Sequence, residues 1–127
     1  MRRKLVTMAA SVVLLSVLCV MEQMIVHSLT QMALEQTAGI LEDIRAGDIS
    51  SAKEKAHALD ETWDKKAVQL EILIDHSTAD DVRYALSRLI AALEGGDRAA
   101  ALIYAGELEG SIEHVYERQA LSVENIL

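Results

Sequence analysis

An uninterrupted apolar run opens the chain, with no charged residue from Leu5 to Met21. A bilayer core about 30 Å thick needs roughly 20 helical residues, because each residue adds about 1.5 Å. Three further apolar residues extend the run past Glu22 and Gln23. The pattern predicts a transmembrane helix that contacts membrane lipid through residues 5–26.

Charge sets the expected orientation of that helix. Arg2, Arg3 and Lys4 precede the run, and the positive-inside rule keeps such residues in the cytoplasm. We therefore predict a single-pass protein of the cell membrane. Residues 1–26 would form the cytoplasmic tip and transmembrane signal anchor, and residues 27–127 an extracytoplasmic helical-hairpin domain.

Two alternatives to a retained anchor are weaker. A cleaved signal peptide needs small residues at the cut, and Val26-His27-Ser28 is a passable site that lacks the Ala-x-Ala pattern. A lipoprotein needs a small residue before the lipidated cysteine, whereas Leu18 precedes Cys19. We therefore expect an uncleaved anchor in which Cys19 is an ordinary apolar residue of the span.

Beyond the membrane run, apolar residues recur at steps of three and four, which is typical of helices with one buried face. The pattern predicts helices over residues 4–46 and 49–75. A third begins with Thr78 as its N-cap, in a capping box with Asp81, and a fourth follows residue 97 and frays between residues 118 and 121. The apolar stripe of the second helix consists of Ile49, Ala52, Ala56, Leu59, Trp63, Ala67, Leu70 and Ile74.

Two Gly-Asp turns connect these helices in pairs. Gly47-Asp48 and Gly96-Asp97 each combine a glycine suited to a left-handed helix end with an aspartate suited to the next N-cap. They stand 49 residues apart. The apolar positions that coincide at this offset are Leu41 and Ile90, Ile44 and Leu93, Ala52 and Ala101, Ala56 and Ala105, Leu59 and Leu108, and Trp63 and Ile112.

The predicted fold is therefore all-α. An N-terminal transmembrane helix continues into an antiparallel bundle of two αα-hairpins, with about four helices in total. The sequence leaves open whether the two hairpins are copies of one plan or two unrelated Gly-capped hairpins.

Composition and charge exclude several kinds of site and partner. The 127 residues include no Pro and one Cys, which excludes an internal disulfide and a multi-Cys zinc site. The net charge of −8 argues against nucleic acid as a partner. Of the 12 basic and 20 acidic residues, three and one lie before residue 27, so residues 27–127 hold 9 basic and 19 acidic residues. A domain of charge −10 favours a basic or metal-bearing partner over anionic lipid.

Asp75-His76 is the most distinctive polar pair, because it ends an apolar run at a turn between helices. One hypothesis is a metal or proton-sensing site completed by Asp80 or by His114 and Glu117, since histidine and carboxylate groups bind zinc and similar ions. His114 and Glu117 share a helix face. The favoured interpretation is structural, with His76 capping the C-terminal end of a helix. Metal ligands are therefore not assigned, and these residues stay candidates.

No nucleophile elbow, phosphate-binding loop or nucleophile–base pair occurs in the sequence, so no catalytic residue or cofactor is predicted. Trp63 lies in the apolar stripe and is expected to anchor the core. We predict a non-enzymatic protein-interaction or scaffold subunit, whose partner is another protein, such as a polytopic membrane protein. The alternatives are a ligand- or metal-responsive sensor that uses Asp75, His76 and His114, and a self-associating helical stalk.

A family resemblance agrees with this interpretation. The segments that carry it are Gly47-Asp48-Ile49, Ala52, Trp63, Ile72-Leu73-Ile74-Asp75-His76, Asp80-Asp81-Val82, Ser111-Ile112-Glu113-His114 and Glu124-Asn125-Ile126-Leu127. They resemble the clostridial domain-of-unknown-function family 4363 over nearly the whole chain. The resemblance implies a short protein with one N-terminal membrane helix and a helical extracytoplasmic part. It implies no activity or substrate.

Overall fold

Four helices form the protein in a computed structural model that describes residues 1–70 and 76–124, and the side chains of these residues except 70 and 119–124. The helices are α1 (Arg2–Ala46), α2 (Ile49–Leu70), α3 (His76–Glu94) and α4 (Arg98–Glu124). No strand occurs in the described ranges. The all-α prediction is confirmed.

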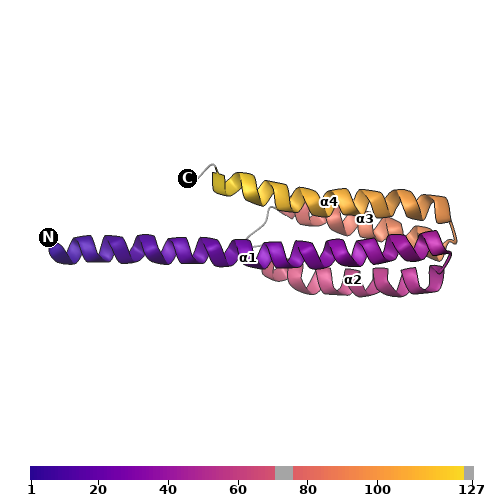
Figure 1. Cartoon of the computed structure of the whole chain (residues 1–127), viewed down its shortest axis with the longest axis horizontal. Helices are drawn as coiled ribbons and strands as arrows, with labels where there is room; N and C mark the ends of the chain where they lie inside the picture. The colour runs from indigo at the N-terminus through magenta and orange to yellow at the C-terminus, as the bar shows by residue number, and fades with distance from the viewer. Residues whose placement is uncertain (71–75, 125–127) are drawn as a thin grey trace.

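The helices form an antiparallel bundle in which each helix has two neighbours. α1 packs against α2 and α4, and α3 packs against the same two helices from the opposite corner. Figure 1 shows the two hairpins side by side, with their turns at the end of the bundle farthest from the N-terminus. The predicted pair of αα-hairpins is therefore confirmed.

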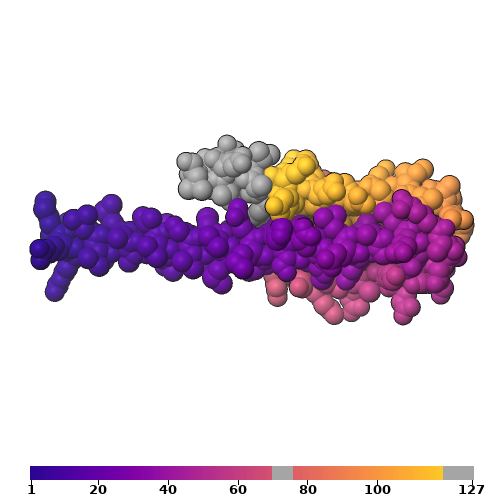
Figure 2. Space-filling model, in the orientation of Figure 1, coloured from indigo at the N-terminus to yellow at the C-terminus, as the bar shows by residue number. Residues whose placement is uncertain are grey.

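α1 has two parts that differ in their surroundings. Its N-terminal part is long and apolar enough to cross a membrane, and none of that apolar stretch is buried. Val26, at 1% exposure, is the first buried residue, and α1 is continuous through it into the bundle. Figure 2 shows the first residues of α1 extending alone beyond the rest of the molecule. Such a large exposed apolar surface needs an apolar environment that the bundle does not supply.

The core is built from equivalent positions of the two hairpins. Nearly every buried residue of α1 and α2 has a buried counterpart 49 residues later in α3 or α4. The counterparts are Leu29 and Thr78, Thr30 and Ala79, Ala33 and Val82, Thr37 and Leu86, Ile40 and Leu89, Ile44 and Leu93, Ala52 and Ala101, Ala56 and Ala105, Leu59 and Leu108, and Trp63 and Ile112. The two hairpins therefore follow one plan.

The two turns repeat the same hydrogen bonds. Gly47 and Gly96 have φ angles of 82° and 70°, in the left-handed region that glycine adopts without a steric penalty. The Asp48 backbone N–H donates to the Asp43 carbonyl oxygen at 2.9 Å, and the Asp97 N–H donates to the Ala92 carbonyl oxygen at 3.0 Å. Both turns therefore end a helix in a left-handed glycine.

The aspartates of these turns also cap the helices that follow. The Asp48 Oδ1 atom accepts a hydrogen bond from the Ser51 N–H at 3.1 Å, and the Asp97 Oδ1 atom accepts one from the Ala100 N–H at 3.0 Å. The predicted N-caps are confirmed, because each side chain satisfies an N–H group in the first turn of its helix.

Two predicted helix ends are wrong. α3 begins at His76, so Thr78 is not its N-cap; the Thr78 side chain is buried and its hydroxyl accepts a hydrogen bond from Arg118 Nη1 at 3.2 Å. α4 continues to Glu124 instead of fraying between residues 118 and 121. For Thr78, contact with α4 takes precedence over the local capping signal. For α4, no Gly or Pro follows Gly110 before Glu124 to end the helix. The predicted end of the second helix at residue 75 lies outside the described residues.

Candidate functional site

The candidate metal ligands that the structure describes lie on α3 and α4. His76 is the first residue of α3 and is exposed. The chain between Leu70 and His76 lies outside the described residues, so the capping role of His76 stays a prediction. His114 Nδ1 lies 3.9 Å from Glu117 Oε2 on α4, which confirms their shared face. Asp75 lies outside the described residues, and Asp80 pairs with Arg83.

These residues do not form a metal site within residues 1–70 and 76–124. No group of three or more His, Cys, Asp or Glu side chains there could hold a metal ion. The structure therefore unites one pair of the predicted set, His114 and Glu117, and the metal-site hypothesis stays a prediction.

Replacement of His76 by alanine tests that hypothesis. We expect His76→Ala to change the melting temperature of the full chain in detergent micelles by no more than a few degrees, because the side chain is exposed. We expect added zinc to leave both melting temperatures unchanged, as it should for a His57→Ala control. A zinc-dependent rise in the wild type that His76→Ala abolishes would establish the metal site instead.

Each hairpin has a groove on its outer side. The groove between α3 and α4 has a volume of about 460 Å³ and is lined by Asp81, Ala85, Arg88, Glu107, Gly110, Ser111 and His114. The groove between α1 and α2 has about 360 Å³ and is lined by Glu35, Gln36, Gly39, Lys55 and Ala58. Three lining positions correspond at the offset of 49, so the grooves are equivalent features of the two hairpins. No local sequence pattern marks these grooves, although the repeat of 49 residues is a signal that they are equivalent.

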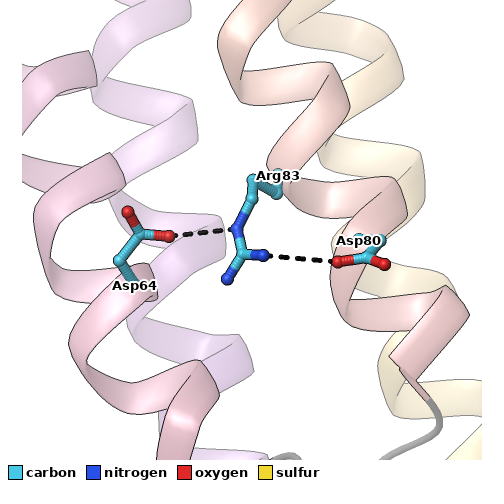
Figure 3. A network of polar contacts seen from close by, with 3 residues as sticks. All are labelled: Asp64, Asp80 and Arg83. Atoms are coloured by element: carbon cyan, nitrogen blue, oxygen red, sulfur yellow. Dashed lines mark hydrogen bonds and ion pairs between the residues drawn. The ribbon is translucent and has the colours of Figure 1, made fainter.

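Ion pairs join the two hairpins along α2 and α3. Arg83 of α3 lies between two carboxylates, with Nε 3.1 Å from Asp64 of α2 and Nη1 3.3 Å from Asp80 of α3 (Figure 3). Farther along, His57 Nε2 lies 3.2 Å from Glu94 Oε1. These side chains are partly exposed, so each pair contributes at most about 1 kcal/mol to stability. The pairs between α2 and α3 instead help to set the register of the two hairpins.

A second ionic contact joins α1 to α2 near the first turn. Lys55 Nζ lies 2.7 Å from Asp43 Oδ2, and the Ser51 hydroxyl donates to the same oxygen at 2.7 Å. The hydrogen bond from Lys55, followed by that from Ser51, holds the pKa of the Asp43 carboxyl below its usual range. The same hydrogen bond raises the pKa of the Lys55 ammonium.

The pKa of Asp60 shifts in the direction opposite to that of Asp43. Desolvation by burial and the nearby Asp64 carboxylate raise the pKa of the Asp60 carboxyl. The folded chain therefore holds this proton more tightly than the unfolded chain does, and ionisation at neutral pH weakens the fold.

A neutral substitute should therefore stabilise the bundle. We expect Asp60→Asn to raise the melting temperature at pH 7, by an amount that shrinks as the pH falls toward about 4, where Asp carboxyls take up protons. Asp81→Asn is the matched control, because the Asp81 side chain is exposed and the substitution should change the melting temperature little. An equal gain from Asp60→Asn at pH 3 and pH 7 would contradict the titration argument.

Comparison with known proteins places most of the chain in one family. The family described as "Domain of unknown function (DUF4363)" matches residues 20–126, a stretch that contains the whole bundle. No curated protein and no solved structure matches the chain.

Proposed function

This chain belongs to the DUF4363 family, a domain of unknown function, and we propose that it is a membrane-anchored helical protein that acts by binding another protein rather than by catalysis. The observation that carries the proposal is the continuity of α1. One helix runs from an apolar part that buries nothing in the bundle to a part that forms one wall of the core. A partner bound to the bundle would therefore be held at a fixed height above the membrane.

The anchor is retained in this proposal. Cleavage after Ser28 would remove Val26 from the core and His27 from its contact with Tyr116, whose ring centroid lies 5.3 Å from that of the His27 ring. The loss of a buried valine would weaken the end of the bundle nearest the membrane. The mass of the mature protein tests this point, since the intact anchor adds the first 28 residues.

The orientation follows the three basic residues before the apolar run, which favour a cytoplasmic N-terminus and an external bundle. Protease added to intact cells should therefore digest the bundle, and it should leave a cytoplasmic control protein intact. A bundle that is protected until the cells are lysed would overturn the orientation.

Cross-linking in native membranes tests the binding function itself. The full chain, purified in mild detergent after cross-linking, should carry a second protein at a fixed ratio, identified by mass spectrometry. The control is a chain that keeps the same membrane helix and has a scrambled sequence over residues 27–127. Recovery of the chain alone would contradict the proposal, and recovery of two copies alone would favour a self-associating stalk.

A further inference from the structure

The outward face of α4 carries an exposed isoleucine and two exposed glycines. Ile103 is 63% exposed, and Gly106 and Gly110 follow at steps of three and four, so the three residues share one side of the helix. We call these three positions the glycine face. All three residues are exposed, and Gly110 also borders the groove between α3 and α4.

The fold of the chain does not require glycine at either position. Neither Gly106 nor Gly110 has a positive φ angle, and a Cβ atom added to either one would meet no atom within 4 Å. Glycine inside a helix is less favourable than alanine, because it loses more backbone entropy on folding. The packing and backbone geometry of this chain therefore do not account for two glycines one turn apart.

The other hairpin supplies an internal comparison. The counterparts of the glycine face, 49 residues earlier on α2, are Glu54, His57 and Glu61, all exposed. His57 pairs with Glu94 and Glu61 pairs with Lys65, as expected of a helix face in water. The same place in the fold is thus polar on α2 and apolar on α4.

Two carboxylates without an ion pair flank the glycine face, whereas Glu107, between the two glycines, pairs with Arg88 of α3. Glu109 and Glu113 lie on α4 next to Gly110, and neither forms an ion pair with any residue that the structure describes. Two copies of the chain meeting at this face would bring these carboxylates together, which disfavours self-association. A basic partner would neutralise them.

We propose that the glycine face is the docking surface for a helix of another protein, with small or apolar residues along the contact and Lys or Arg beside them. Missing Cβ atoms at positions 106 and 110 let a second helix approach α4 closely, and Ile103 supplies apolar contact. Glu109 and Glu113 would pair with the basic side chains at the rim. This inference rests on the proposed binding function and names where and what the chain binds.

Site-specific photo-cross-linking of the full chain in native membranes tests the proposal. A photoreactive amino acid replaces Ala99, which is exposed one turn before Ile103, or its counterpart Ser50 on α2 as the matched control. We expect a discrete cross-linked product from position 99 in at least fivefold greater yield than from position 50. Sequencing of the cross-linked peptide should give a helical segment with Lys or Arg beside small or apolar residues.

A second set of variants separates docking from folding. With the cross-linker at position 99, Gly106→Ala with Gly110→Ala should raise the melting temperature, because alanine is the better helix former, and should lower the cross-linking yield severalfold. Gly39→Ala is the control, since it adds the same methyl group to α1 beside Lys55 and should leave the yield unchanged. Equal yields from positions 99 and 50, a product made of two copies of the chain, or a partner segment without basic residues would each overturn the proposal.

The two proposals can fail separately. A partner that still co-purifies with an Ile103→Glu chain at the wild-type ratio would leave the binding function intact and remove the glycine face as its site. A chain that recovers no partner in either form would remove the binding function as well.

Discussion

Trp63→Ala should remove a large part of the stability of the bundle. Trp63 is 1% exposed and is the largest of the fully buried side chains. Truncation of a buried tryptophan to alanine costs about 3–5 kcal/mol, against a total stability of about 5–15 kcal/mol for a typical domain. We expect helicity to be lost at a far lower urea concentration than in the wild type, measured by circular dichroism of the full chain in micelles.

Trp63→Phe is the matched control. The Trp63 indole N–H is buried with no hydrogen-bond partner, and an unsatisfied buried donor costs about 1–3 kcal/mol. Phenylalanine keeps most of the apolar contact and removes that donor, so the two effects should nearly offset each other. We expect a stability within about 1 kcal/mol of the wild type. A phenylalanine variant as unstable as the alanine variant would show that the indole N–H has a partner.

The fold could be predicted because its main determinants are local. The apolar stripe through Ala52, Leu59 and Trp63 specifies a helix with one buried face, whichever helix packs against it. Gly47 and Gly96 mark the turns, since a positive φ angle favours glycine. Short turns between amphipathic helices make antiparallel hairpins, so the bundle followed from these signals.

What could not be predicted depends on how the helices align with one another. Thr78 has the sequence signature of an N-cap, yet its hydroxyl accepts a hydrogen bond from Arg118, 40 residues away. The pair of Arg83 with Asp64 likewise requires a specific register between α2 and α3. No local pattern carries that register, which is set by packing across the core.

The candidate site was harder to predict for the same reason. The sequence pointed to His76 and His114, whereas the structure shows Ile103 of α4 exposed beside two exposed glycines. Gly106 and Gly110 resemble ordinary helix glycines until their exposure and the free space around them are known. The repeat then shows that these glycines are unusual, because the equivalent positions on α2 carry polar residues.

Two arginines in the apolar part of α1 should release the protein from membranes without unfolding it. Val13 and Leu14 lie near the middle of the run and are exposed. An arginine at the centre of a transmembrane helix costs about 2.5–3.5 kcal/mol, so Val13→Arg with Leu14→Arg should shift partitioning by more than about a thousandfold. The chain should move from the membrane pellet to the supernatant, whereas the swap Val13→Leu with Leu14→Val should stay in the pellet.

The stability of the released chain tests whether the bundle folds independently of the anchor. No residue before Val26 is buried in the bundle, so the urea midpoint of the double-arginine chain should equal that of the wild type in micelles. A chain that stays in the pellet at high salt would show that the bundle itself holds the membrane. A released chain with a lowered midpoint would show that the N-terminal part of α1 supports the core, and that anchor and bundle are one folding unit rather than two.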